Sequence, residues 1–215
     1  MPVLKLNVSN VLGVTERVGS SYVTSSSSQF FTSQLFTSCM TRSIFLDACL
    51  SGSAASVTST VALATCGEVE DGAAAGPING PSQWLWGEHE AYTKEATWRH
   101  TVSGYVIHHA MSILWASVYE SVCRSPEPKS LTRIVGEAAG VGALAYVVDY
   151  YVAPSRLRPG FRKHLGPRSI FAVYASFAAG LALATIVRQR ERAAASLESC
   201  RFARKLHCVP LDSCR

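Results

Sequence analysis

His108, His109 and Asp149 stand out in this sequence because each interrupts a long apolar stretch. An ionisable side chain inside such a stretch is costly to bury, so it marks a candidate functional position. An imidazole changes its protonation near neutral pH, and a nearby carboxylate stabilises the charged form. The chemistry that these residues indicate is therefore proton uptake or contact with a polar solute.

The two stretches are expected to be helices that run in opposite directions. His108 then lies about six residues into the first stretch and Asp149 about five residues before the end of the second. At a rise of about 1.5 Å per residue these depths agree within one helical turn. Ser112 and Tyr119 follow His108 at helical spacing and share its face. The sequence predicts a polar pocket of His108, His109, Asp149, Ser112 and Tyr119, and a purely structural pair that sets helix register is the alternative.

Asp47, Glu120 and Glu137 also lie in apolar stretches, but close to their ends. A side chain at such a position reaches water by extending along the helix surface. We therefore expect these three carboxylates to be solvated.

A short segment rich in Pro and Trp, residues 77–87, precedes the first histidine. Tryptophan favours the headgroup layer of a membrane, so Trp84 and Trp86 predict a segment at the interface. Asn79 lies in its polar turn, and Ser82 is placed to cap a short helix. The segment is interpreted either as an anchor or as a lid over the His/Asp pocket.

The composition favours a membrane protein. Charged residues make up 16 % of the chain and hydrophobic residues 48 %, whereas soluble domains carry about 25 % charged residues. The apolar residues gather in blocks at about 43–66, 102–123, 134–153 and 169–187. Each block has the length of a bilayer core. We therefore predict an all-α fold, an integral membrane four-helix bundle whose partner is the lipid bilayer, with a Ser/Thr-rich coil as the alternative for the first block.

Small residues recur at every fourth position in three of the blocks, a spacing that lets helices approach closely. Such faces predict tight packing within the chain, or a homo-oligomer. The small residues of these faces are Ala48, Gly52, Ser56, Thr60 and Ala64 in the first block, Gly136 and Gly140 in the third, and Ala172, Ser176, Gly180 and Ala184 in the fourth.

The ends of the chain differ from the blocks. Residues 1–40 are rich in Ser and Thr without a sustained apolar period, which predicts a disordered leader. A further hypothesis is that the protein is translated from Met40. The expected division is a leader at 1–40, a transmembrane domain at 41–192 and a basic cytoplasmic tail at 193–215.

The charges of the connections predict the orientation. The connection at 124–133 is basic, and so is the segment after the fourth block, with Arg188, Arg190 and Arg192. Both termini are therefore expected in the cytoplasm. The first outer connection, 67–101, carries six acids and two bases, whereas the second, 154–168, carries five bases and no acid. A basic connection outside the membrane conflicts with this orientation. We expect the acidic and the basic outer connection to pair by charge and form a cap.

The sequence contains no hydrolase, phosphate-loop, zinc-protease or dinucleotide motif. The seven cysteines form no CxxC pair and no common zinc pattern, so neither a metal nor a cofactor is predicted. The net charge of +5 is not accompanied by a basic stripe with aromatic residues, so nucleic-acid binding is not expected.

Several short runs of this sequence resemble a group of uncharacterised bacterial inner-membrane proteins of similar size, and the layout is distantly similar to the YagU-type inner-membrane family. The resemblance implies a helical bundle in a bacterial inner (cytoplasmic) membrane and carries over no catalytic residue. We expect a non-enzymatic membrane bundle; a small proton-linked transporter or permease and a membrane enzyme are the alternatives. The runs are 79–87 (NGPSQWLWG), 99–101 (RHT), 104–105 (GY), 107–109 (IHH), 148–150 (VDY), 154 (P), 158–161 (RPGF) and 171–175 (FAVYA).

Overall fold

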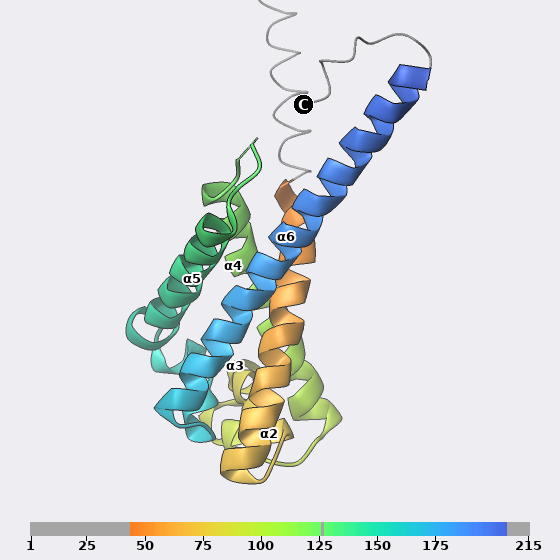
Figure 1. Ribbon diagram of the computed structural model, residues 1–215. Helices are drawn as coiled ribbons and strands as arrows, with labels where there is room; N and C mark the ends of the chain where they lie inside the picture. Colours follow the sequence, from red (N-terminus) through yellow and green to blue (C-terminus); the bar gives the residue numbers. More distant parts are fainter. Residues whose placement is uncertain (1–43, 126, 206–215) are drawn as a thin grey trace, which may run out of the picture. The chain divides into compact units, whose positions relative to one another are not determined.

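The computed structural model describes residues 44–125 and 127–205, and every element within these ranges is helical, without a strand (Figure 1). The predicted all-α class is confirmed for this part of the chain. The chain divides into two units, residues 1–44 and 45–215, and the fold is that of the second unit. The predicted leader at 1–40 and the proposed start at Met40 lie outside the described residues, as does 206–215 of the predicted tail.

The elements alternate between long helices and groups of short helical turns. In chain order they are an N-terminal helix Ile44–Asp71, α2 (Ala75–Asn79), η1 (Gly80–Ser82), α3 (Gln83–Trp86), η2 (Glu88–Tyr92), η3 (Trp98–Val102), α4 (Ser103–Val122), α5 (Leu131–Val147), η4 (Val148–Val152), η5 (Ser155–Leu157), η6 (Phe161–Lys163) and α6 (Pro167–Lys205).

Three helices among the described residues are long and apolar enough to cross a membrane: Ile44–Asp71, Leu131–Val152 and Pro167–Phe202. The first block is therefore a helix, and its interpretation as a coil is wrong. The second block forms α4, which is not among the three helices. His108, His109 and Glu120 lower its hydropathy.

The long helices pack at glycines where a side chain does not fit. A Cβ atom at Gly52 of the N-terminal helix would lie 2.6 Å from the Cα atom of Ile113 in α4. A Cβ atom at Gly180 of α6 would lie 2.5 Å from the Cα atom of Ala55 in the N-terminal helix. The N-terminal helix therefore packs against both α4 and α6, and Figure 1 shows it beside α6. These contacts confirm the predicted close packing at the first and fourth blocks.

The third predicted face is not used within the described chain. A Cβ atom at Gly136 or at Gly140 would meet nothing within 4 Å. Close approach between α5 and α6 instead occurs at Gly142, where a Cβ atom would lie 3.2 Å from the Cβ atom of Ala178. The prediction that Gly136 and Gly140 pack inside the bundle is wrong, because α5 turns them outward and presents Gly142 to α6.

The acidic connection (67–101) and the basic connection (154–168) form a cap together over one end of the long helices, as predicted. The Gln83 side chain donates to the carbonyl of Arg158, and Lys163 Nζ donates to Gln83 Oε1 over 3.0 Å. Partial burial lowers the pKa of the Lys163 ammonium group. His164 is buried, with its Nδ1 atom 2.6 Å from Asp71 Oδ2 and its Nε2 atom 2.7 Å from the carbonyl of Ala91.

The cap is not held by the general charge matching that the sequence predicted. The four arginines of its basic connection form no ion pair with a carboxylate among the described residues. Arg162 instead stacks on the ring of Tyr150 at 4.2 Å and donates to the hydroxyl of Tyr146 over 3.2 Å. Arg162 thus holds the basic connection on the end of α5. Specific hydrogen bonds and the Lys163 Nζ atom, 4.6 Å from the centroid of the Tyr92 ring, join the two connections. The arginines are Arg156, Arg158, Arg162 and Arg168.

Many large apolar side chains of the long helices face outward. A helical surface of this kind is unusual in a soluble protein and suits contact with lipid. Exposed examples are Phe45, Leu50, Val57 and Val61 on the N-terminal helix, Val106 and Leu114 on α4, Leu144 and Val147 on α5, and Phe171, Leu183 and Val187 on α6.

Candidate functional site

A small cavity of about 50 Å³ lies between α4, the end of α5, α6 and the cap. A single water needs about 10–15 Å³ of such space, so this cavity has room for a few waters or one small polar group. Most of its walls are apolar and aromatic. Its polar lining comes from Ser59, His108, Ser112, Asp149 and Tyr174.

His108 reaches the N-terminal helix. Its Nε2 atom lies 2.9 Å from Ser59 Oγ, which also donates to the carbonyl of Ala55 over 2.7 Å. A hydroxyl has one hydrogen, so Ser59 accepts from the imidazole while it donates to Ala55. This arrangement favours the histidine tautomer with its proton on Nε2. The imidazole also packs edge-on against the ring of Phe161, with 6.0 Å between ring centroids.

Asp149 faces the same cavity from a π-helical turn, η4. Its Oδ2 atom accepts a hydrogen bond of 2.6 Å from the hydroxyl of Tyr174 in α6. A π turn inserts an extra residue into a helix and is frequent at functional sites. Tyr174 also packs against Tyr146 and Tyr150, with centroid distances of 5.4 and 6.3 Å.

The structure places His108, Ser112 and Asp149 around one cavity, as the helical rise predicted. The expected direct pair is not formed: among the described residues, His108 bonds to Ser59 and Asp149 bonds to Tyr174. The cavity thus holds an imidazole and a carboxylate that each have a hydroxyl partner. Such an arrangement can exchange protons through water or hold a small polar molecule between the two groups.

Two of the residues predicted for the pocket lie elsewhere. His109 stacks with Tyr105 at a centroid distance of 5.7 Å, and its buried Nδ1 atom has no hydrogen-bond partner in the part of the chain that the structure describes. The Tyr119 hydroxyl lies 3.1 Å from Thr185 Oγ1 and belongs to a second cavity at the opposite end of α4. Neither residue lines the cavity of His108. Tyr119 lies about three turns farther along α4, and His109 points to another side of the helix because successive residues are rotated by about 100°.

The Pro- and Trp-rich segment divides between two roles. Trp84 lines the cavity, and its indole N–H donates to the carbonyl of Arg158 over 3.3 Å. Trp86 instead lies under the Arg99 guanidinium, 4.6 Å from the ring centroid. Trp84 therefore forms part of the cavity wall, while Trp86 packs on the start of the α4 segment, and the role of the segment as a lid stays a prediction.

Asn79 and Ser82 belong to the interior of the cap. Asn79 Nδ2 donates to the carbonyls of Thr93 (2.8 Å) and Glu95 (3.1 Å), and its Oδ1 atom accepts from Thr101 (2.8 Å). Ser82 precedes α3 but makes no capping bond, and its buried hydroxyl has no hydrogen-bond partner within residues 44–125 and 127–205. The predicted capping role of Ser82 is wrong, whereas Asn79 organises the chain that leads to α4.

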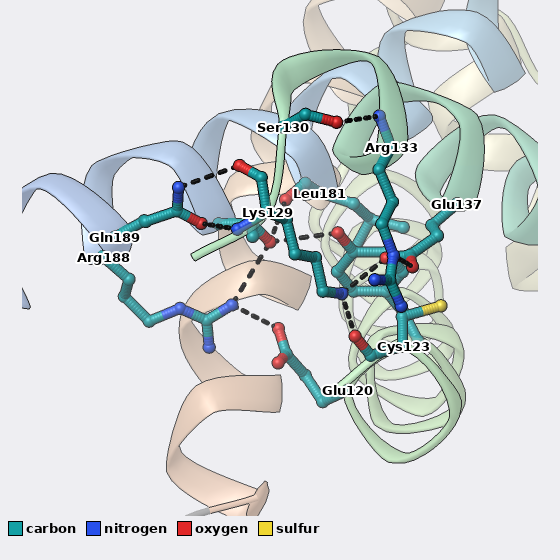
Figure 2. Close-up of polar contacts among 11 residues, drawn as sticks. Glu120, Cys123, Lys129, Ser130, Arg133, Glu137, Leu181, Arg188 and Gln189 are labelled. Carbon is teal, nitrogen blue, oxygen red and sulfur yellow. Dashed lines mark hydrogen bonds and ion pairs between the residues drawn. The ribbon is translucent and has the colours of Figure 1, made fainter. Parts of the chain in front are cut away.

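Ion pairs fill the opposite end of the bundle. Arg188 of α6 lies 3.0 Å from Asp47 Oδ1 and donates to Glu120 Oε1 over 2.5 Å. Ser51 also donates to that carboxylate, which is 7 % exposed. Figure 2 shows the Arg188 guanidinium directed at Glu120. The expectation that Glu120 is solvated is wrong, since α6 brings a cation to it.

Glu137 has its own partners beside this group. Lys129 Nζ lies 2.5 Å from Glu137 Oε2 and also donates to the carbonyl of Cys123. Arg133 Nε lies 2.8 Å from Glu137 Oε1 (Figure 2). The Gln189 amide exchanges two hydrogen bonds of 3.0 Å with the backbone of Lys129. The connection between α4 and α5 is thereby tied to α6, and Glu137 is paired rather than solvated.

Sequence reasoning missed Ser59 and Tyr174, the direct partners of His108 and Asp149. Neither carries a charge, so neither interrupts its apolar block in a way that marks it. Within the described residues, no group of three His, Cys, Asp or Glu side chains is arranged to hold a metal ion.

No protein-family model matches the chain, and no curated protein or solved structure matches it either.

Proposed function

We propose that the chain is a multi-pass membrane protein whose N-terminal helix, α4, α5 and α6 cross the bilayer as one bundle. The observation that carries this proposal is the combination of three helices with the length and apolarity of membrane spans and large apolar side chains on their outer surfaces. A bilayer solvates such surfaces, and water does not.

The fourth span of the proposal, α4, has 20 residues. At about 1.5 Å per residue this length matches a hydrocarbon core of about 30 Å. Its low mean hydropathy comes in part from Ser112 and Glu120, which are buried in the bundle, while Val106, Leu114 and Val122 face outward. The surface that lipid would contact is therefore more apolar than the sequence average.

Within this membrane bundle we propose a non-enzymatic role in a bacterial inner membrane, with both termini in the cytoplasm and the cap outside. The basic residues around the α4–α5 connection support this orientation. The outward glycines Gly136 and Gly140 offer a face for a second copy of the chain. Polar groups at both ends of the bundle bond mainly to one another, which suits a core that sets helix register.

Proton-linked transport is the second candidate function, favoured by the cavity that His108 and Asp149 share. Both groups can change charge, both have a hydroxyl partner, and Trp84 of the cap lines the same cavity. Such groups inside a membrane bundle are typical of proton relays.

Proteoliposomes that contain a pH-sensitive dye discriminate the two functions. Transport predicts a proton flux that His108→Ala and Asp149→Asn each abolish, while the adjacent control His109→Ala retains it. A non-enzymatic bundle predicts that all three variants fold and none changes the proton leak of the vesicles. Fractionation of cell membranes by alkaline extraction tests the membrane assignment itself, since release into the soluble fraction would contradict it.

A further inference from the structure

We propose that the second cavity, between the α4–α5 connection and α6, binds the phosphate group of an anionic phospholipid. The cavity has a volume of about 590 Å³ and lies at the end of the bundle opposite the cap. The inference rests on the proposed membrane location but not on either function of the His108 cavity.

Positive charge exceeds negative charge in the lining of this cavity. One carboxylate, Asp47, is shared by three guanidinium groups: Arg188 at 3.0 Å, Arg192 at 3.6 Å and Arg124 at 4.0 Å. Phosphate oxygens are strong acceptors for guanidinium groups. The basic residues of the lining are Arg124, Lys129, Arg188, Arg190 and Arg192, and the acidic ones are Asp47, Glu120 and Glu127.

Arg188 retains an N–H group for an additional acceptor. Its Nη1 atom is buried and pairs with Asp47 Oδ1 at 3.0 Å, but in a geometry that forms no hydrogen bond with the described residues. Its Nη2 atom is the one that bonds to Glu120 (Figure 2). A phosphate oxygen in the adjacent cavity would accept the hydrogen bond that this ion pair does not form.

The arginines of the cavity stand at the depth of lipid phosphates. The run from Arg168 to Arg188 in α6 contains no charged residue between its ends. A helix of this length spans about 30 Å, which is the thickness of a hydrocarbon core. With Arg168 at one surface, Arg188, Arg190 and Arg192 lie at the other.

The walls of the cavity favour a lipid over a free anion. Leu131, Ile134 and Ile186 line it beside the charged groups. An inorganic phosphate would use only the basic side, whereas a lipid places its acyl chains on the apolar side. Basic pockets between helices on the cytoplasmic side are known to take anionic headgroups.

Native mass spectrometry of the full chain in detergent, titrated with phosphatidylglycerol or phosphatidylcholine, tests the proposal. Arg190 and Arg192 are exposed, so Arg190→Gln/Arg192→Gln removes cavity charge without disturbing the core. Arg201→Gln/Arg204→Gln is the matched control, with the same loss of charge farther along α6. We expect the first variant to lose about thirtyfold in affinity for phosphatidylglycerol, given the usual contribution of each arginine near an anionic surface. The control should bind like the wild type.

Three outcomes would overturn the inference. They are equal affinity for the two lipids, equal loss in the two variants, and displacement of phosphatidylglycerol by an equal concentration of inorganic phosphate. Any of these in a protein that still fractionates with membranes refutes the lipid site alone. A protein that does not fractionate with membranes refutes the proposed location instead.

Discussion

Replacement of Arg188 by methionine should destabilise the bundle strongly, because it leaves a buried carboxylate without its cation. Glu120 is 7 % exposed and, among the described residues, would retain only the neutral Ser51 hydroxyl as a donor. Asp47 would not be left alone, since Arg192 and Arg124 lie 3.6 and 4.0 Å from it. The cost therefore arises at Glu120, and we expect about 3 kcal/mol of lost unfolding free energy.

The double variant separates this penalty from lost packing. Glu120→Leu removes the carboxylate and leaves Arg188 its contact with Asp47, so we expect a cost of about 1 kcal/mol. In Arg188→Met/Glu120→Leu neither charge of the pair remains. The loss of unfolding free energy in this double variant should therefore be about 2 kcal/mol smaller than the sum of the two single losses.

Reversible unfolding in mixed micelles, followed by tryptophan fluorescence, gives the free energies of this cycle. Arg190→Met is the matched control, because it removes the same charge from an exposed position two residues away. The control should change stability by less than about 0.5 kcal/mol. Purely additive costs of the two single substitutions would refute the reasoning, since they would mean that Arg188 does not stabilise Glu120.

Three further substitutions test the packing and the polar contacts by the same unfolding measurement. Gly180→Leu should lower the unfolding free energy by more than about 3 kcal/mol, because backbone atoms occupy the space that its side chain needs. Gly140→Leu should be near neutral in the monomer, since nothing lies within 4 Å of that position. Equal losses in the two variants would contradict the helix arrangement. Tyr174→Phe should cost about 1–3 kcal/mol by removing the hydrogen bond to Asp149, and an unchanged stability would contradict that bond. Asn79→Ala should speed amide exchange in the cap with little effect on the long helices, since it removes three hydrogen bonds of the cap; uniform exchange rates would show that Asn79 is not specific to the cap.

The long helices follow from the sequence because a run of apolar residues and its length are local properties. The α5 helix begins a few residues before the apolar block because Ser130 accepts a capping bond from the Arg133 N–H group. The cap was harder to predict. Its helical turns are too short for periodicity, and partners distant in sequence, such as Asp71 and His164, hold them in place.

The depth of the candidate cavity along the helices was predictable, whereas the hydrogen-bond partners of His108 and Asp149 were not. Helical rise places His108 and Asp149 at similar depth, but it does not say which residue faces each one. The π turn at η4 changes the direction of Asp149, and no residue type marks such a turn. Small-residue spacing likewise reports that a helix face permits close approach. It could not distinguish Gly136, which faces outward, from Gly142, which packs on α6.

The charged end of the bundle shows the same limit. Arg188 was interpreted from the sequence as a marker of orientation, and Glu120 as a solvated carboxylate. Their contact joins residues 68 positions apart, so only the packing of α6 against α4 reveals it.

Whether α4 crosses the membrane is the most direct test of the proposed four-span bundle. His89 in the cap and Glu127 in the α4–α5 connection are exposed and flank this helix. In a chain whose native cysteines are replaced, His89→Cys and Glu127→Cys can be labelled in intact cells with a membrane-impermeant thiol reagent. The proposal predicts labelling of residue 89 from outside and of residue 127 only after permeabilisation, whereas labelling of both from the same side would contradict it.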